Sequence, residues 1–335
     1  MTGLPYDALP TRMVTTNGAE LRVVDVGDGP VVILAHGFPE LAFSWRHQIR
    51  PLVDAGYRVL VPDQRGYGGS SRPEAIEAYD IFALTGDLVG LLDDVGAEQG
   101  VFVGHDWGSM VVWQSALLRP ERVAGVVGTS VPYVRRSLAP PIQLMRQAFA
   151  DQFFYIVYFQ EPGVADADLA ADPARTMRRL LAGMATEGEL TPDPDRGALD
   201  GRGFVDRLPE PDGLPDWLIQ AELDRYVEEF TRTGFTGGIN WYRNFDRNWE
   251  LTPHLAEARI TMPSLFIGGG ADPVLTMSPP GRGDDDCDDH RGNVIIEGAG
   301  HWVQQEAPGP VNDALLAFLD SLDLDHLRPS PGDPS

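Results

Sequence analysis

Short apolar runs recur along most of this chain, and longer stretches with helical patterning separate them. This alternation is typical of a mostly parallel β-sheet covered by helices, because parallel strands are buried on both faces and need long crossover connections. A run near 12–16 predicts a further, antiparallel strand at the edge of the sheet. The predicted fold class is therefore α/β, with the other strands expected at 21–26, 31–36, 57–62, 101–105, 123–129, 264–269 and 293–298.

The strand rhythm is interrupted between about residues 134 and 245, where no comparable apolar runs occur. This section carries helical patterns instead, for example at 145–159 and 216–235. A helical insertion between two halves of a sheet predicts a cap over the carboxyl edge of the strands, where open α/β sheets bind ligands. We expect core segments at 1–133 and 246–335, a helical cap domain at 134–245 and a disordered tail from about residue 328.

The 335-residue chain carries a formal net charge of −24, and its positive charge comes only from arginine. Binding to nucleic acid or to an anionic membrane needs basic patches, so the charge argues against both kinds of partner. The N-terminal residues lack the basic start and apolar segment of a secretory signal, and no apolar run reaches the ~20 residues that span a bilayer. We therefore expect a cytoplasmic protein.

The single cysteine, Cys287, excludes an internal disulfide. It lies within the acidic run DDDCDDH at 284–290. Carboxylates can bind a metal, but this run has no ligand pattern, so we expect a solvated acidic loop.

The segment VFVGHDWGSM at 101–110 runs an apolar strand into a sharp turn and then into a helical pattern. Asp106 lies at the centre of a small-x-nucleophile-x-small spacing, which is typical of a nucleophile elbow. Such a turn forces its central residue into an unfavourable backbone conformation that small flanking residues make tolerable. The structural alternative is that Asp106 only caps the helix that follows.

The segment HGFPE at 36–40 directly follows an apolar run, and its loop can face the elbow. The backbone N–H groups of Phe38 and Trp107 would then form an oxyanion hole. Pro39 follows an aromatic residue, a setting compatible with a cis peptide bond. The alternative is an ordinary Gly-Pro turn.

Two later segments place polar residues after predicted strands. Asp272 follows the run SLFIGG, and His301 follows the last predicted strand, in the segment GHW. The chain order Asp106, Asp272, His301 matches nucleophile, acid and base. Taken singly, Asp272 could be a turn residue before proline, and His301 a structural histidine. Glu40 and His105 stay open between a role in the reaction and a structural role.

The chain resembles the soluble epoxide hydrolases of the α/β-hydrolase fold. The segments that carry the resemblance extend from about residue 10 to 320 and are HGFPE (36–40), DQRGYGGS (63–70), GHDWG (104–108), YFQEPG (158–163), NWYRN (240–244) and GHW (300–302). GHDWG alone is shared with haloalkane dehalogenases, whereas its combination with YFQEPG and NWYRN is quite specific. The resemblance implies an α/β-hydrolase fold with an inserted helical cap, and neither a cofactor nor a metal.

The resemblance also implies two cap tyrosines that hold the epoxide oxygen. By motif position these are Tyr155, just upstream of the YFQ triplet, and Tyr242 in NWYRN. Tyr158 lies close by on the same helical pattern but belongs to the triplet itself. The alternative for each tyrosine is a core residue with a satisfied hydroxyl.

The predicted reaction follows from the chemistry of a carboxylate, which is ionised at neutral pH and attacks saturated carbon without a base. Asp106 would open an epoxide while Tyr155 and Tyr242 activate the oxygen, giving a covalent ester. His301, oriented by Asp272, would then activate water to release a vicinal diol. The predicted function is epoxide hydrolysis, on hydrophobic epoxides in a cavity lined by Phe38, Trp107, Phe154 and Trp241.

Three alternatives remain. A haloalkane dehalogenase would bind halide with a second tryptophan or an asparagine, often at the loop position that Phe38 holds here. A fluoroacetate dehalogenase would want arginine where Trp107 stands. A ligand-binding protein that had lost catalysis would usually lack at least one of the five site residues. The sequence leaves open the particular epoxide, the regio- and enantioselectivity, the biological role (detoxification, lipid turnover or biosynthesis) and whether the protein is a monomer or a homodimer.

Overall fold

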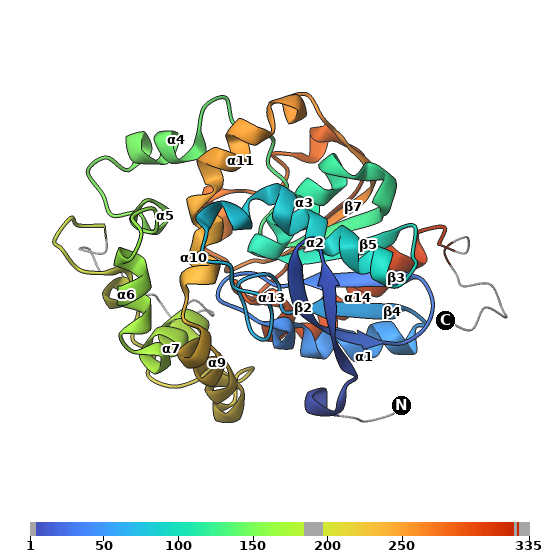
Figure 1. Cartoon of the computed structure of the whole chain (residues 1–335), viewed down its shortest axis with the longest axis horizontal. Helices are drawn as coiled ribbons and strands as arrows, with labels where there is room; N and C mark the ends of the chain where they lie inside the picture. The colour runs from blue at the N-terminus through green and yellow to red at the C-terminus, as the bar shows by residue number, and fades with distance from the viewer. Residues whose placement is uncertain (1–4, 184–196, 325–326, 328–335) are drawn as a thin grey trace.

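The computed structural model describes residues 5–183, 197–324 and 327. Its centre is an eight-stranded sheet with the order β1-β2-β4-β3-β5-β6-β7-β8 (Figure 1). β2 pairs antiparallel with β1 and β4, and all later neighbours pair in parallel. The strands are β1 Thr11–Thr16, β2 Ala19–Val26, β3 Val31–Ala35, β4 Arg58–Pro62, β5 Gly100–His105, β6 Val123–Thr129, β7 Ile260–Gly269 and β8 Cys287–Ile296.

Every predicted strand is present, and the antiparallel strand lies at the edge of the sheet as expected. The prediction of a loop at 284–290 is wrong in part. Asp284–Asp286 form a short 3₁₀ helix, η6, but β8 already begins at Cys287 and pairs with β7. β8 is an edge strand, so its acidic side chains can reach water while one side of its backbone stays paired.

Helices cover both faces of the sheet (Figure 1). The α-helices are α1 Arg46–Asp54, α2 Ile81–Asp94, α3 Trp107–Leu118, α4 Pro141–Ala148, α5 Tyr155–Tyr158, α6 Val164–Ala170, α7 Pro173–Gly183, α8 Phe204–Arg207, α9 Gln220–Thr233, α10 Thr236–Arg243, α11 Phe245–Leu251, α12 Val274–Met277, α13 Val303–Glu306 and α14 Pro308–Asp320. The other 3₁₀ helices are η1 Tyr6–Ala8, η2 Ala42–Trp45, η3 Ile76–Tyr79, η4 Pro120–Arg122 and η5 Pro253–Leu255.

Two apolar clusters hold these layers together, and successive strand residues contribute to them in turn. Ile33 and Phe102 pack in the cluster that contains Val111 of α3. Val32 and Val103 pack in the cluster that contains residues of α1 and α14. Because side chains alternate across a strand, each central strand is apolar on both faces, as the continuous runs in the sequence predicted.

The segment between β6 and β7 contains only helices in its described part, α4 to α11 and η5. The helical pattern at 145–159 is broken, because α4 ends at Ala148 and α5 begins only at Tyr155. In the break the rings of Phe149 and Phe154 stack with centroids 4.1 Å apart. The exact boundaries of a cap at 134 and 245 stay predictions, and the predicted tail from 328 lies outside the described residues.

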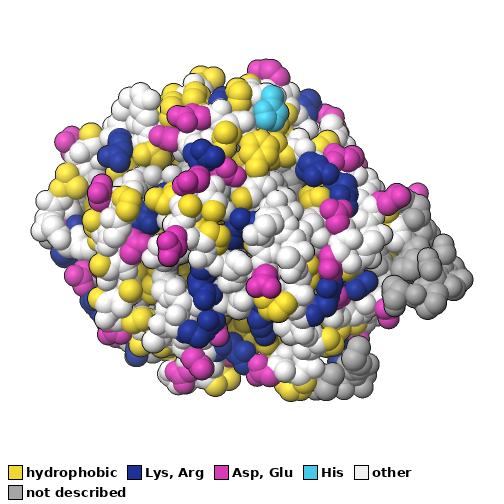
Figure 2. All heavy atoms as spheres, in the orientation of Figure 1, with side chains coloured by type: hydrophobic (Ala, Val, Ile, Leu, Met, Phe, Trp, Pro, Cys, Tyr) yellow, Lys and Arg dark blue, Asp and Glu magenta, His cyan; other side chains and the backbone are white. Residues whose placement is uncertain are grey.

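Acidic and arginine side chains are interspersed over the visible face of the molecule (Figure 2). Among the described residues, no helix is both long enough and apolar enough to cross a membrane.

Candidate active site

Asp106 occupies the turn between β5 and α3 with φ 52° and ψ −117°. Positive φ is unfavourable for a residue with a side chain, so neighbouring structure has to impose it. Gly104 and Gly108 leave no room for side chains, because a Cβ on Gly104 would meet the Gly108 carbonyl, and one on Gly108 the Ala35 carbonyl. The Asp106 side chain makes no capping hydrogen bond to α3, which argues against the alternative of a simple helix cap.

The loop after β3 faces this turn. The backbone N–H of Phe38 donates to Oδ1 of Asp106 at 2.8 Å. The Phe38–Pro39 peptide is cis. Trp107 is the first residue of α3, so its N–H is one of those that an α-helix leaves without an internal partner. The Phe38 N–H thus contacts the Asp106 carboxylate, and the Trp107 N–H begins the helix that follows the turn. Their use together as an oxyanion hole stays a prediction.

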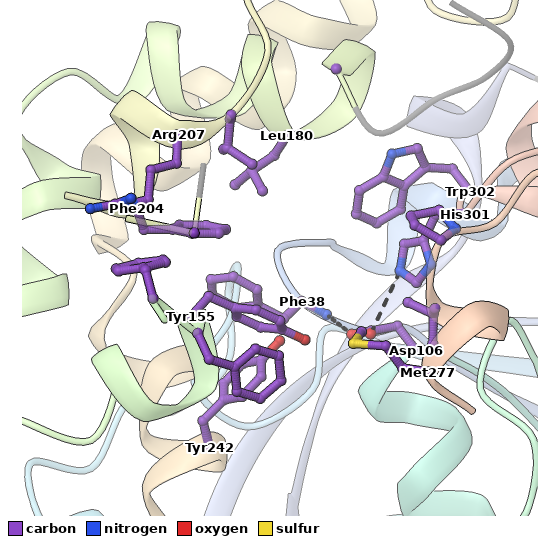
Figure 3. Close-up of a pocket in the computed structure, with 17 residues that line it drawn as sticks. Phe38, Asp106, Tyr155, Leu180, Phe204, Arg207, Tyr242, Met277, His301 and Trp302 are labelled. Carbon is purple, nitrogen blue, oxygen red and sulfur yellow. Dashed lines mark hydrogen bonds and ion pairs between the residues drawn. The ribbon is translucent and has the colours of Figure 1, made fainter. Parts of the chain in front are cut away.

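His301 lies in the turn between β8 and α13, and Asp272 in the turn between β7 and α12. Nδ1 of His301 is 3.0 Å from Oδ2 of Asp272 and 3.1 Å from its Oδ1. Nε2 of His301 is 3.6 Å from Oδ2 of Asp106 (Figure 3). The structure therefore brings the three predicted residues together, with His301 between Asp272 and Asp106 as predicted.

The protonation of His301 depends on both carboxylates. Burial alone lowers the pKa of His301, but Asp272 and Asp106 outweigh burial and raise this pKa well above the ordinary value. The imidazole therefore carries a proton while Asp106 is ionised. Neutralising Asp106 would remove one of the two supports for that charge.

Glu40 and His105, left undecided by the sequence, form a fully buried pair beneath these residues. The Glu40 carboxylate accepts from Nδ1 of His105 at 2.6 Å and from the Gly37 N–H at 2.9 Å. Nε2 of His105 faces the His301 carbonyl at 2.8 Å. Burial acts to raise the pKa of Glu40, but His105 and the Gly37 N–H outweigh it and lower this pKa to about 2. The pair links the Phe38 loop to the His301 loop.

Tyr155 begins α5, and Tyr242 lies near the end of α10. Their rings are 5.9 Å apart at 75°, and their hydroxyls point into the cavity on the side facing Asp106 (Figure 3). Burial, and after it the charge of Asp106, raises the pKa of both hydroxyls well above the ordinary tyrosine value. Both tyrosines are therefore neutral and able to donate hydrogen bonds.

A cavity of about 360 Å³ lies between these two groups of residues, and we call it the active-site cavity. It is lined by Asp106, His301, Tyr155 and Tyr242, together with the predicted Phe38 and Phe154. Most of the remaining wall was not predicted, because apolar character alone does not mark a residue as lining a cavity, even for Trp302 in the segment GHW. The residues concerned are Phe153, Leu180, Phe204, Leu208, Val274, Met277 and Trp302.

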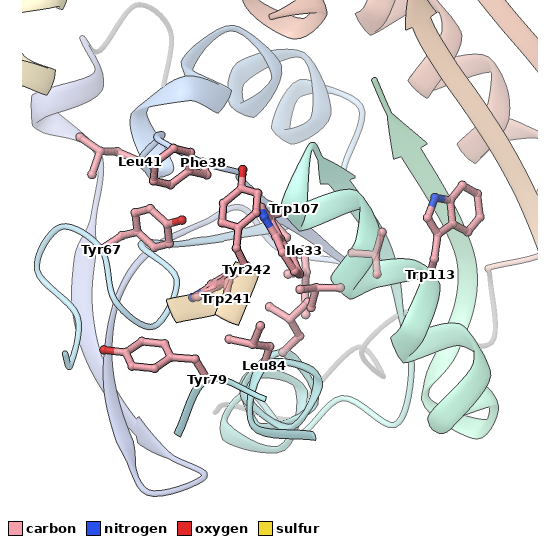
Figure 4. Packing of buried hydrophobic residues seen from close by; sticks show 14 of the residues in the cluster. Ile33, Phe38, Leu41, Tyr67, Tyr79, Leu84, Trp107, Trp113, Trp241 and Tyr242 are labelled. Carbon is pink, nitrogen blue, oxygen red and sulfur yellow. The ribbon is translucent and has the colours of Figure 1, made fainter. Parts of the chain in front are cut away.

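Two predicted lining residues lie elsewhere. Trp107 lines the neighbouring cavities rather than this one. Trp241 is fully buried behind Tyr242, and its indole N–H donates to the Arg65 carbonyl at 3.1 Å (Figure 4). Trp241 is a core residue in this structure, and the expectation that it contacts substrate is corrected. The sequence shows an aromatic residue beside a motif tyrosine, but it does not show which side of the helix faces the cavity.

Within the described ranges, no cluster of three or more His, Cys, Asp and Glu side chains is placed to hold a metal ion.

A carboxylate on a strand-to-helix turn, a histidine–carboxylate pair at later strand ends and a helical insertion define an α/β hydrolase. The family model for the alpha/beta hydrolase fold matches residues 30–308 of the chain. This match confirms the predicted fold class.

Similarity to individual proteins narrows the class. The chain is 62% identical over 322 residues to Epoxide hydrolase A of Mycobacterium tuberculosis, across 93% of this chain and 98% of that protein. It is 38% identical to Epoxide hydrolase 3 of Siraitia grosvenorii, across 94% and 99% of the two chains. The crystal structure of Epoxide Hydrolase A from Mycobacterium thermoresistibile matches with a TM-score of 0.90 at 60% identity, across 94% of this chain and 99% of that one. The chain therefore belongs to the epoxide hydrolases of the α/β-hydrolase fold, as its motifs predicted.

Proposed function

We propose that this protein converts hydrophobic epoxides and water into vicinal diols through a covalent ester on Asp106. The observation that carries the proposal is the placement of the Asp106 carboxyl group and two tyrosine hydroxyls on opposite sides of one apolar cavity. A nucleophile and a proton donor on opposite sides of a strained ring are what ring opening requires.

In the first step, Oδ2 of Asp106 attacks an epoxide carbon and the carbon–oxygen bond breaks. Tyr155 and Tyr242 hydrogen-bond the departing oxygen, and one of them transfers its proton to it. Oδ1 meanwhile stays with the Phe38 N–H, which orients the carboxylate. The product is an alkyl ester of Asp106 and a tyrosinate, which takes the His301 proton through the cavity.

In the second step, neutral His301 removes a proton from water, and the hydroxide attacks the carboxyl carbon of Asp106. The tetrahedral oxyanion faces the N–H groups of Phe38 and Trp107, each of which is typically worth about 3 kcal/mol of barrier. The intermediate expels the diol alkoxide, which is protonated by His301. The resulting Asp106 acid returns its proton to His301, and the starting state is restored.

The charge of Asp106 couples the two steps. Its negative charge helps to raise the pKa of His301 and of both tyrosines. Formation of the neutral ester removes that charge, so all three groups release protons more readily after the nucleophile has reacted. His301 therefore becomes a base only when there is an ester to hydrolyse.

The cavity wall argues against the related dehalogenases. The loop residue beside the nucleophile is Phe38, whose side chain offers no halide donor, and its ring packs edge-on against Tyr242 at 5.4 Å. Trp107 stands where a fluoroacetate dehalogenase would want arginine. The predicted cytoplasmic location, monomeric or dimeric state and role in detoxification stay predictions.

The test is to incubate the purified protein separately with styrene oxide and with bromobutane, following diol and bromide. Diol without bromide, lost in Asp106→Ala, is the expected result. Bromide without diol would contradict the proposal and reduce the tyrosines to packing residues.

A further inference from the structure

β6 ends at Thr129, and Ser130 follows it; both residues are fully buried, and the proposed reaction uses neither. In the sheet, β6 lies between β5, which leads into Asp106, and β7, which is followed by Asp272. β8, which precedes His301, is the third strand away from β5. Since neighbouring strands are about 4.8 Å apart, the loop that carries His301 has to cross roughly 14 Å to reach Asp106. The end of β6 lies on that path.

Hydrogen bonds tie this strand end to the segments that carry the nucleophile, the acid and the base. The Thr129 carbonyl accepts from the Asp106 N–H at 3.2 Å, and the Ser130 N–H donates to the Ile267 carbonyl of β7 at 2.9 Å. The Ser130 hydroxyl donates to the His301 carbonyl at 2.6 Å. The nucleophile turn, β7 and the histidine loop therefore meet at Thr129 and Ser130.

Ser130 has a backbone conformation that a residue with a side chain seldom adopts. Its φ is 63°, and among the described residues other than glycine, only Asn17 and Asp106 share a positive φ. Asn17 precedes a glycine in the tight turn between β1 and β2, where asparagine adopts this conformation readily. Asp106 occupies the nucleophile turn. Such strain persists only where the surrounding structure imposes it, and it gathers at functional sites, so Ser130 is a candidate for a role in this site.

The imidazole of His301 is hydrogen-bonded on one side only. Its Nδ1 lies 3.0 Å from Oδ2 of Asp272. Its Nε2 lies 3.6 Å from Oδ2 of Asp106, which is too long for a hydrogen bond (Figure 3). In the proposed second step, a water molecule has to lie between Nε2 and the Asp106 ester. The position of the imidazole relative to that ester therefore depends on the backbone that carries it.

Hydrogen bonds hold this backbone on both sides of His301. The His301 carbonyl faces the Ser130 hydroxyl at 2.6 Å and Nε2 of His105 at 2.8 Å. The Glu306 carboxylate accepts from the N–H groups of the residues before and after His301, each at 2.8 Å. Glu306 lies on α13, directly after the loop, so it maintains the shape of the loop. Ser130 and His105 anchor the loop to the centre of the sheet.

We propose, resting on the function proposed above, that Ser130 is a positioning residue for hydrolysis of the Asp106 ester. Its hydroxyl holds the His301 carbonyl and thereby keeps the imidazole at the distance at which a water molecule fits against the ester. Ser130 lines neither of the two cavities that Asp106 lines, so it acts through His301. Ring opening uses Asp106 and the cap tyrosines and does not depend on this contact.

The test follows the covalent adduct of styrene oxide by rapid quench and intact-protein mass spectrometry in wild type, Ser130→Ala, Ser130→Gly and Ser109→Ala. Ser130→Ala removes the hydroxyl and keeps the strain, whereas Ser130→Gly removes both, because glycine adopts positive φ freely. Ser130→Gly also keeps the test valid if Ser130→Ala does not fold. Ser109→Ala is the matched control, since the hydroxyl of this buried serine donates to the nearby Val131 carbonyl at 2.7 Å.

We expect the adduct to form at the wild-type rate in both Ser130 variants and to decay roughly tenfold to a hundredfold more slowly, because a reacting group misplaced by about 1 Å can lose about a hundredfold in rate. In the steady state, kcat and KM should fall by the same factor and leave kcat/KM unchanged. A general loss of folded enzyme would lower kcat/KM instead. Ser109→Ala should leave both rates unchanged.

Adduct decay at the wild-type rate in Ser130→Gly would overturn the role of Ser130 alone. Formation and decay slowed equally, or an equal loss in Ser109→Ala, would also overturn it, since these outcomes describe a general structural role. Turnover without any adduct, even in His301→Gln, would contradict the proposed ester and with it the role of Ser130.

Discussion

On the core side of the cavity, Asp106, His301 and Glu40 are fixed by hydrogen bonds to other core residues. On the cap side, Tyr155 and Tyr242 are fixed by aromatic rings, with Phe159 edge-on to both at 5.6 and 5.1 Å. Hydrogen bonds define both position and charge, whereas ring packing defines position alone. In the proposed reaction, the core side therefore sets protonation and nucleophilicity, and the cap side sets the shape of the cavity and the position of the proton donors.

The largest expected effect comes from the core. Asp106→Ala removes the proposed nucleophile, so we expect styrene oxide turnover to fall roughly ten-thousand-fold or more, as for other covalent nucleophiles. Initial diol formation measures the loss. The midpoint of thermal unfolding should be little changed, because the substitution leaves the backbone turn at this position in place. Residual turnover within about a hundredfold of wild type would contradict the assignment of Asp106.

His301→Gln should separate the two halves of the reaction. In the proposed mechanism, ester formation needs Asp106 and the tyrosines, whereas ester hydrolysis needs His301 as the base, so we expect turnover to fall roughly a thousand-fold. Intact-protein mass spectrometry should show the variant carrying the mass of one substrate. A variant that is slow but carries no adduct would contradict a role for His301 in the second step.

The cap tyrosines should affect only ring opening. We expect Tyr155→Phe and Tyr242→Phe each to lower the rate of ring opening by roughly tenfold to a hundredfold. The double variant should lose more, since in each single variant the remaining hydroxyl can still hydrogen-bond the epoxide oxygen. When the two tyrosine substitutions are combined with His301→Gln, the covalent adduct on the protein should form more slowly than in His301→Gln alone. Tyr158→Phe is the matched control, because its hydroxyl instead contacts Asp168 at 3.3 Å. A Tyr158 effect as large as that of Tyr155 would break the assignment.

Glu40→Gln should affect stability more than turnover. Because the pKa of Glu40 falls from 4.5 to about 2 in the folded protein, the ionised group stabilises the fold above about pH 4.5. This contribution is lost as pH falls toward 2. We expect a cost of about 3 kcal/mol in urea unfolding at pH 7, shrinking below pH 4, because one member of a buried pair is removed. A cost that stays constant from pH 7 to pH 3 would contradict this pairing.

The two sides also differ in what the sequence reveals. Asp106, Asp272 and His301 follow strands whose apolar runs are unmistakable, so chain order predicts their meeting at one edge of the sheet. Tyr155 and Tyr242 come from helices far apart in the chain, and only their motifs distinguish them from core tyrosines. Trp241 shows the limit, because helix orientation decides whether a side chain faces the cavity or the core.

Other features depend on tertiary contacts that no local pattern records. The burial of Glu40 against His105 requires a loop and the end of a strand that are 65 residues apart in the chain to meet. The early start of β8 reflects pairing with β7, which overrides the turn-like composition of its acidic residues.

The covalent ester is tested most directly by a single turnover of styrene oxide in ¹⁸O-water with the enzyme in excess. Attack of water on the Asp106 carboxyl carbon leaves the heavy oxygen in the protein, while the diol receives an oxygen from the original carboxylate. Mass spectrometry of the peptide that contains Asp106 should therefore show the label. Label found in the diol alone would contradict the ester and favour direct attack of water on the epoxide.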